Sequence, residues 1–417
     1  MSDTIVIGSG LAGLTAAIRL SQAGQSVTLL SFGMGGIQLG QGTIDVLGYG
    51  STGDLIKRPF DQLADFTSTQ PGHPYNQLNQ VKTAIDWFAD LLLDLLEKTE
   101  GENQLVPTAL GAMRPTYLVQ PSMVWPEPDS VAIVGPRQIK DFYPDLVAAN
   151  LAKTAQVKAI PYHIDLPARS GEVDSSPVNY AKALDNQEFL NHFADQLEKL
   201  VSDEAAVCLP AILGLHTPAH QYLSQVLKRP VVEALVGPPS IPGMRLNIAL
   251  TEIAQAGGVR IIFGSKVSGF QADRGTIQAV ILHQAGYDKA YRADNFVYAG
   301  GGFESGALAM DSYGQVSETV FDLPLRGLDQ DLITGDYWGD QKLFAVGVGV
   351  DSSMRPLDLD GHLVYQNLYA VGGLLASAIR WSEKSGDGIA VASAFTAANH
   401  ILGAGAPAWS TDNEGSK

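Results

Sequence analysis

The sequence predicts an α/β fold in which a Rossmann-like domain, built on a parallel sheet with helices on both faces, is interleaved with a second α/β domain. Three observations support this prediction. An apolar strand runs into a glycine-rich turn near the start of the chain, two late strands also end in glycines, and the middle of the chain alternates strand and helix patterns. A chain of 417 residues is long enough for two domains of roughly 100 to 200 residues each.

The first element of the chain is a complete βαβ unit. The apolar residues 5–7 lead into the pattern Gly8-x-Gly10-x-x-Gly13, a helical pattern follows, and residues 26–30 form a second apolar run. Here the first glycine allows a tight turn, the second lets the backbone approach a phosphate, and the third lets the helix lie close to the sheet. A phosphate would meet free N–H groups at the positive end of a helix dipole. We expect a nucleotide or flavin phosphate at this turn, the alternative being a glycine-rich turn without a ligand.

The segment that leaves the second strand, residues 32–53, is crowded with glycines. Sheets of this class place the ligand crevice at the carboxyl ends of their strands. We therefore expect the segment to contact the ligand, and Gly42 and Thr43 in particular. A flexible connection is the alternative that the composition allows.

The middle of the chain predicts an inserted α/β layer. A strong amphipathic helical pattern covers residues 79–98, and a proline-punctuated region follows as far as Pro128. Strand patterns then alternate with helical patterns, the strands at 131–135, 157–166 and 205–209 and the helices at 138–153, 187–201 and 219–228. This alternation is typical of a parallel sheet with crossover helices.

The last third of the chain is expected to return to the first domain. The expected elements are a helix at 244–256, strands at 259–263, 267–272, 277–282, 295–299 and 367–371, and a helix that starts at Gly386. Two of these strands run into glycines, so three glycine turns would converge on one crevice. The expected boundaries are residues 1–50, 241–302 and 346–403 for the first domain, 51–240 and 303–345 for the second, and 404–417 for a flexible tail.

Composition excludes several classes of function. The chain has 27 Lys and Arg against 44 Asp and Glu, a formal charge of −17 that would repel nucleic acid. Salt screens this field beyond about 8 Å, so local arginines can still capture a small anion. Cys208 is the only cysteine and lies in an apolar run, so we expect neither a disulfide nor an iron–sulfur cluster held by this chain alone. We expect no metal site, and no apolar run approaches the ~20 residues that span a bilayer. A cytoplasmic chain is predicted.

Taken together, the glycine turns at 8–13, 300–301 and 372–373 resemble those of the two-domain flavoproteins related to fumarate reductase. Within that class the chain is most similar, over nearly its full length, to the B subunit of the anaerobic glycerol-3-phosphate dehydrogenase. The segments that carry this resemblance are residues 42–47, 73–75, 107–116, 239–246 and 354–356.

The resemblance implies a flavin-bearing subunit of a complex that oxidises sn-glycerol 3-phosphate to dihydroxyacetone phosphate and passes electrons to quinone. It also implies two partners: a sister flavin subunit, and an iron–sulfur subunit that attaches the complex to the inner face of the membrane. A single cysteine agrees with clusters that are held by another chain.

The flavin implied by the resemblance is FMN, with FAD not excluded. Flavoproteins that bind adenosine usually place Asp or Glu at the end of the second strand, where this chain has Ser31. The residues expected to contact the flavin are Gly8, Gly10, Leu11, Ala12, Gly13, Ser31, Gly42, Thr43, Val267, Gly300, Gly301, Gly372, Gly373, Gly386, Asp387 and Gly388.

Oxidation of an alcohol by a flavin needs a base for the hydroxyl proton and cations for the substrate's phosphate. His73, in a proline–glycine turn, is the candidate base, and a surface histidine is the alternative. Arg114, Arg245 and Arg355 lie beside prolines or in a glycine–proline turn and could grip an oxyanion; structural ion pairs are their alternative. Two other functions stay open: a stand-alone flavin dehydrogenase of another small acid, and a non-catalytic electron-relay subunit.

Overall fold

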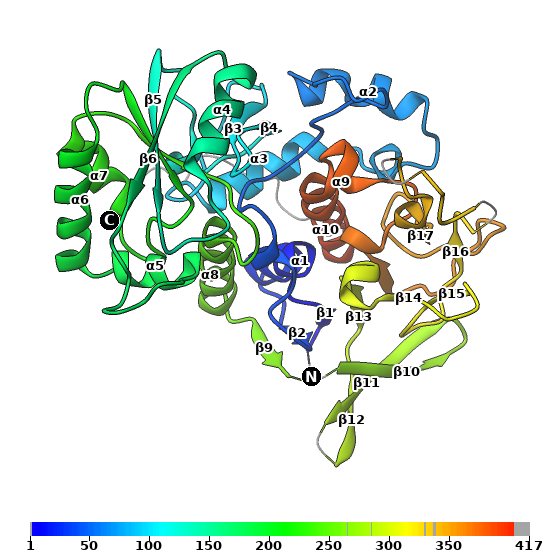
Figure 1. Cartoon of the computed structure of the whole chain (residues 1–417). Helices are drawn as coiled ribbons and strands as arrows, with labels where there is room; N and C mark the ends of the chain where they lie inside the picture. Colours follow the sequence, from blue (N-terminus) through cyan, green and yellow to red (C-terminus); the bar gives the residue numbers. More distant parts are fainter. Residues whose placement is uncertain (1, 265, 285, 329–330, 337–338, 404–417) are drawn as a thin grey trace, which may run out of the picture. The chain divides into compact units, whose positions relative to one another are not determined.

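A computed structural model describes residues 2–264, 266–284, 286–328, 331–336 and 339–403 (Figure 1). The chain divides into two compact units. Unit 1 comprises Met1–Gly36, Asp45–Leu92 and Leu250–Lys417, and unit 2 comprises Ile37–Ile44 and Leu93–Ala249. The tail expected at 404–417 lies outside the described residues. The domain boundaries expected from the sequence stay a prediction.

The core of unit 1 is a parallel five-stranded sheet. Its strands lie in the order β18 (Leu368–Ala370), β13 (Asn295–Tyr298), β1 (Thr4–Ile7), β2 (Val27–Ser31) and β9 (Arg260–Phe263). Every residue of β1 and β2 is buried, because the central strands of a parallel sheet are covered on both faces. The predicted α/β class with a parallel sheet is confirmed.

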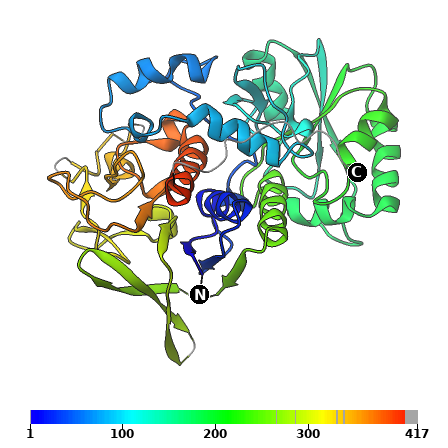
Figure 2. The same ribbon diagram turned by 180° about the vertical axis from the view of Figure 1, so that it is seen from behind.

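Two helices of unit 1 pack against each other beside this sheet, α1 (Leu11–Gln22) and α10 (Gly386–Leu402), as both views show (Figures 1 and 2). Arg19 of α1 donates to the side chain of Asn399 of α10 (2.9 Å). α3 (Val81–Leu91) packs on α10. The helix predicted at 79–98 is therefore too long: it ends at Leu91 because the chain passes into unit 2 after Leu92.

The remaining elements of unit 1 are short. The two predicted antiparallel strands form a sheet with a third, and their turn at Arg274 and Gly275 has positive φ at both residues, as a two-residue hairpin turn of type I′ requires. The bounds are β10 (Lys266–Asp273), β11 (Thr276–Gln284), β12 (Tyr287–Tyr291), β14 (Leu308–Met310), β15 (Val316–Glu318), β16 (Leu325–Arg326), β17 (Gly347–Val348), α2 (Pro59–Ser68) and α9 (Arg380–Glu383).

Unit 2 is built on a parallel four-stranded sheet with the order β6 (Lys158–Ile164), β5 (Ser130–Pro136), β7 (Ala206–Pro210) and β8 (Val231–Ala234). Its other elements are the hairpin β3 (Gln104–Pro107) and β4 (Met113–Thr116), and the helices α4 (Pro144–Thr154), α5 (Pro177–Leu184), α6 (Gln187–Leu200) and α7 (Ala219–Leu227). α8 (Ile241–Ala256) continues from unit 2 into unit 1.

The alternation predicted for the middle of the chain is thus present, although α5 and β8 were not predicted and several boundaries are shifted. The helix expected at 138–153 begins only at Pro144, because proline fits the first helical position, where an N–H has no intrahelical acceptor. Cys208 is fully buried in β7, and burial raises the pKa of its thiol to about 12. Among the described residues, no helix is long and apolar enough to cross a membrane.

Candidate functional site

The first predicted glycine turn joins β1 to α1, and its backbone fits tightly. Gly8 has φ +106°, and a Cβ there would lie 2.2 Å from the carbonyl oxygen of Ala299. A Cβ at Gly13 would lie 1.9 Å from the carbonyl oxygen of Gly8. These two glycines therefore let the turn pack against the end of β13 and let α1 lie close to β1.

Gly10 differs from its neighbours because the space beside it is open. A Cβ at Gly10 would meet no atom within 4 Å. Gly10 is the N-cap of α1, and no side chain caps this helix. The N–H groups of the first helical turn, which includes Leu11, Ala12 and Gly13, have no acceptor within the helix. Free N–H groups at the positive end of a helix are the arrangement that binds phosphate.

The other two predicted glycine turns lie against this one, at the carboxyl edge of the sheet. Gly300 follows β13 directly after Ala299, the residue that contacts Gly8. At the end of β18, a Cβ on Gly372 would lie 2.8 Å from the Cβ of Ala12. A Cβ on Gly373 would lie 3.4 Å from the Cα of Gly301. The structure thus brings the three turns together within unit 1.

Ser31, at the end of β2, also lies at this edge of the sheet, next to the first glycine turn. Its hydroxyl donates to the carbonyl oxygen of Gly33 (2.6 Å) and lies 2.8 Å from the hydroxyl of Ser9. A Cβ on Gly35 would lie 2.7 Å from the backbone nitrogen of Gly10. The segment after β2 is thereby fastened to the glycine turn by a serine pair, at the position where other families use a carboxylate for the ribose. The residues of this edge fit the phosphate end of a nucleotide or flavin.

The start of α10 is fastened to residue 45. The backbone N–H of Asp45 donates to Asp387 (3.2 Å), and the N–H of Gly388 donates to the carbonyl oxygen of Asp45 (2.8 Å). A Cβ on Gly388 would lie 2.3 Å from the hydroxyl oxygen of Tyr75. Gly386 opens the helix, as predicted. This helix end is therefore closely packed, unlike that of α1.

His73 lies inside unit 1, fully buried. Its Nδ1 accepts from the N–H of Tyr75 (3.2 Å), so in the neutral ring Nε2 carries the proton and donates to Glu383 (3.2 Å). Glu383 also accepts from the hydroxyl of Ser385 (2.7 Å) and from the N–H of Ile379 (3.0 Å). Both ring nitrogens are engaged, so a role as base would require one of these bonds to break.

Two pKa values in this cluster are shifted. Burial acts to raise the pKa of Glu383, but the hydrogen bonds and the charge of its partners outweigh it and hold the pKa below its ordinary range. Burial raises the pKa of Tyr75 well above its ordinary range, and nearby carboxylates add to the shift. Tyr75 therefore stays a hydroxyl, which donates to the carbonyl oxygen of Val46 (2.6 Å).

Arg245 is held in a buried ion pair within unit 2. Its two terminal nitrogens bind the two carboxylate oxygens of Glu233 (2.7 and 3.0 Å), and Nε donates to the carbonyl oxygen of Gly214 (2.8 Å). Glu233 is fully buried and also accepts from Ser122 (2.6 Å). Burial acts to raise the pKa of Glu233, but Arg245 and these donors lower it overall.

The loop that contains Gly42 is fastened to the same part of unit 2. Gln120 accepts from Arg245 (3.2 Å) and donates to the carbonyl oxygens of Gly42 (2.9 Å) and Pro242 (2.8 Å). Gly42 has φ +69°, and a Cβ there would lie 2.2 Å from the backbone of Pro242. Arg114 donates to the hydroxyl of Thr43 (3.2 Å). One hydrogen-bond network in unit 2 therefore includes four of the predicted site residues: Arg114, Arg245, Gly42 and Thr43.

The remaining candidates lie elsewhere in unit 1. Arg355 makes an ion pair with Asp351 (2.8 Å) four residues earlier in the chain. Val267 is buried in β10, paired with Leu282 of β11. Sequence reasoning did not single out Glu233 or Glu383. The signal for Glu233 was available, because it is the one charged residue of the apolar strand β8. Glu383 had no such signal, since its partner His73 is 310 residues away in the chain.

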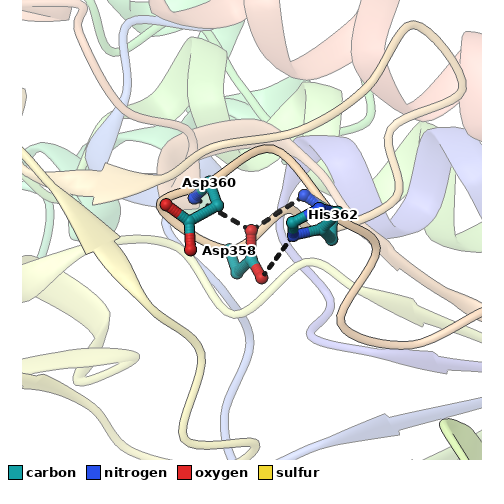
Figure 3. Close-up of side chains that lie close together, drawn as sticks. All are labelled: Asp358, Asp360 and His362. Atoms are coloured by element: carbon teal, nitrogen blue, oxygen red, sulfur yellow. Dashed lines mark hydrogen bonds and ion pairs between the residues drawn. The ribbon is translucent and has the colours of Figure 1, made fainter.

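One cluster has the residue types of a metal site: Asp358, Asp360 and His362, whose ligand atoms lie within 4.8 Å of one another (Figure 3). Asp358 accepts from the N–H groups of Asp360 (3.0 Å) and His362 (2.8 Å) and from the ring of His362 (3.3 Å). These bonds, led by that from the His362 N–H, lower the pKa of Asp358. These hydrogen bonds within the cluster stabilise a surface turn, which accounts for its geometry without a metal ion.

Residues 3–389 match the family described as FAD binding domain. The chain is 30% identical to a Yersinia pestis protein named as the B subunit of anaerobic glycerol-3-phosphate dehydrogenase, over 96% of this chain and 98% of that one. The chain belongs to this B-subunit family. A Halobacterium salinarum member, named as a probable B subunit of the same enzyme, is also 30% identical, over 95% of this chain and 96% of that one. Among solved structures, a 3-ketosteroid Δ1-dehydrogenase from Sterolibacterium denitrificans matches with TM-score 0.45 and 12% identity, over 96% of this chain and 99% of that one.

Membership in the B-subunit family confirms the predicted family and the class of flavin oxidoreductases. The family match supports the prediction that the chain binds a flavin. FMN, the flavin that the resemblance implied, is not supported, because the matching family is described by FAD.

Proposed function

We propose that this chain is the flavin-bearing B subunit of a complex that oxidises sn-glycerol 3-phosphate to dihydroxyacetone phosphate and passes the electrons to quinone. The observation that carries the proposal is the 30% identity over 96% of the chain to a protein of that name. Its partners would be a sister flavin subunit and an iron–sulfur subunit, and the complex would lie at the inner face of the cell membrane.

The flavin is FAD in this proposal, held by unit 1. Gly10 and the first turn of α1 would hold its phosphates, because the helix start offers N–H donors and a Cβ at Gly10 would meet no atom within 4 Å. Gly300, Gly301, Gly372 and Gly373 bring backbone to the same edge of the sheet. When bound, the flavin accepts the hydride equivalent of the oxidised alcohol.

In this proposal the chain's side chains hold the loops of the site in place, and a direct role in taking the substrate's proton is less well supported. His73 orients the turn after residue 71 through its bonds to Tyr75 and Glu383. Arg245 orients the loop at Gly42 through Gln120. Direct roles of His73 as base, and of Arg114, Arg245 and Arg355 as anion ligands, stay predictions, as does contact of the flavin with Ser31, Thr43, Val267, Gly386, Asp387 and Gly388.

A second function is favoured by one specific observation. His73, the candidate base, has no exposed surface and both ring nitrogens are bonded. This arrangement suits an electron-relay subunit that holds flavin and leaves substrate chemistry to its sister subunit. In that case the chain is still part of the same complex.

Cofactor release and flavin reduction separate these possibilities. Heat release followed by chromatography identifies the flavin, and we expect FAD at one per chain. Anaerobic addition of sn-glycerol 3-phosphate should bleach the flavin of the isolated chain if this chain oxidises the substrate. If it is a relay, bleaching will require the sister subunit. A folded chain that takes up neither flavin would contradict both functions.

A further inference from the structure

A cavity of about 210 Å³ lies within unit 1, and its lining includes Leu375 and Ala376, which follow the glycine turn at Gly372 and Gly373. Its lining includes the turn that contains Pro71, Gly72, Pro74 and Gln77, and it includes Arg326 and Gly349. Pockets for drug-sized ligands run from about 300 to 1,000 Å³, so this cavity has the size for a smaller molecule.

Arg326 is the only charged group among the described residues of the cavity wall, and among the described residues it makes no salt bridge. Within the described part of the chain, its guanidinium donates to one acceptor, the backbone carbonyl oxygen of Asp358 (3.0 Å). The carboxylate of Asp358 is already occupied by three donors from Asp360 and His362. A guanidinium has five N–H donors, so most of those of Arg326 remain available.

Both of these parts of the lining are held in place. Arg326 packs onto the backbone of Gly349, where a Cβ would lie 2.0 Å from its Nε. The bonds of His73 to Tyr75 and to the buried Glu383 fix the turn that contributes Gln77. A cation that is fixed before a ligand arrives loses less conformational entropy on binding.

We propose that this cavity is an anion site, in which Arg326 binds the phosphate group of a small phosphate ester in a two-pronged contact. The planar fork of arginine matches phosphate oxygens in this way, and Gln77 can donate to the ester's hydroxyl groups. The identity of the ester as sn-glycerol 3-phosphate rests on the proposed function, whereas the anion site itself rests on the cavity and on the arginine in its wall.

The test is calorimetric titration of the full chain saturated with FAD, so that the nucleotide phosphate site is filled. The probes are sn-glycerol 3-phosphate, inorganic phosphate and succinate at constant ionic strength. Arg326→Gln should weaken binding of both phosphates at least tenfold, while Arg292→Gln, at an exposed position outside the cavity, should change it less than twofold. Gly349→Ala keeps the charge but displaces the guanidinium, so it should weaken binding as well.

Circular dichroism and the Tm of each variant without ligand show whether it is folded. A folded Arg326→Gln chain that binds both phosphates as the parent does would overturn the inference, as would Arg326-dependent binding of succinate alone or no binding of any probe. Arg326-dependent binding of phosphate, without reduction of the flavin by sn-glycerol 3-phosphate in the complex, would sustain the anion site and refute the proposed function. Reduction of the flavin by sn-glycerol 3-phosphate, with phosphate binding unchanged in Arg326→Gln, would support the proposed function and refute the anion site.

Discussion

At the scale of single residues, His73, Arg245 and Arg355, three of the predicted site residues, are held by carboxylates of the same chain. Glu233 is a carboxylate in a fully buried strand, and it is tolerable only because Arg245, Ser122 and a backbone N–H satisfy it. The same guanidinium was a candidate anion ligand in the sequence. The N–H donors of Arg245 are taken by protein acceptors, so few are left for a ligand. Arg326, by contrast, donates to one acceptor among the described residues.

Replacing Arg245 by Ala should lower the free energy of unfolding by about 3–5 kcal/mol, because Glu233 is left buried without its partner. Urea unfolding measures this. The double variant Arg245→Met, Glu233→Leu should recover most of the loss, since no buried charge remains. An unchanged urea midpoint in Arg245→Ala would contradict the ion pair. Unchanged ligand affinity in a folded variant would remove Arg245 as an anion ligand.

Glu383 should make the stability depend on pH on the acid side. Its pKa in the folded chain lies below the value of about 4.3 expected when unfolded. The stabilisation is therefore complete above that pH and is lost as the pH falls through the folded value. Glu383→Gln should cost about 1–3 kcal/mol at pH 7, since it removes hydrogen bonds to a charged group. It should also show a shallower fall in stability between pH 5 and pH 3, measured by urea unfolding at each pH, with Asp61→Asn as the exposed control. Parallel pH profiles would contradict the shift.

At the scale of elements, the glycine turn before α1 offers two substitutions with opposite expected results. Gly8→Ala meets both positive φ and a backbone oxygen at 2.2 Å, so it should cost about 2–5 kcal/mol. Gly10→Ala meets nothing and has φ −73°, so stability should change by at most about 1 kcal/mol.

The Gly10→Ala chain should nevertheless lose flavin, because the added methyl group projects into the space proposed for the phosphate. Flavin absorbance per chain after purification, and Tm without flavin, separate the two effects. Gly24→Ala is unsuitable as a control because its φ is +84°, whereas Gly335→Ala has open space and no positive φ and lies outside the glycine turns. Full flavin content in Gly10→Ala would place the phosphate elsewhere.

The elements that the sequence predicts well are those whose pattern is local. The strands expected at 131–135 and 295–299 correspond to β5 and β13, because short apolar runs bounded by turns specify buried strands. The long helix at 79–98 was wrong at its end, where apolar spacing continues although the chain changes unit. Strand order was not predictable, since the neighbours β1 and β13 are almost 300 residues apart.

The same limit applies to the candidate site. Glycine spacing predicted the three turns individually, and the expected convergence required only that their strands lie in one sheet. The partners of His73 and of Arg326 could not be predicted, because Glu383 and Asp358 approach them only through tertiary packing. A histidine in a loop motif and a buried histidine with both nitrogens bonded look alike in a sequence.

At the scale of the whole molecule, the charge of −17 acts against the anionic substrate that the local arginines would bind. The Debye length falls from about 30 Å at 0.01 M salt to about 8 Å at 0.15 M. Long-range repulsion is therefore strong in dilute salt and nearly gone at physiological salt. The contact with a guanidinium in a cavity is screened less, because it is short and partly buried.

We therefore expect the association rate constant of sn-glycerol 3-phosphate, measured by stopped-flow mixing, to rise about two- to tenfold between 0.01 and 0.15 M salt, the lower end of the range for long-range steering. The dissociation rate constant should change less. Glycerol, which is uncharged, provides the control and should show no salt dependence. An association rate constant that falls with salt would mean that the electrostatic potential near the site is positive despite the net charge of the chain. Arg114 and Arg355 would then be the first residues to replace in locating the source of that potential.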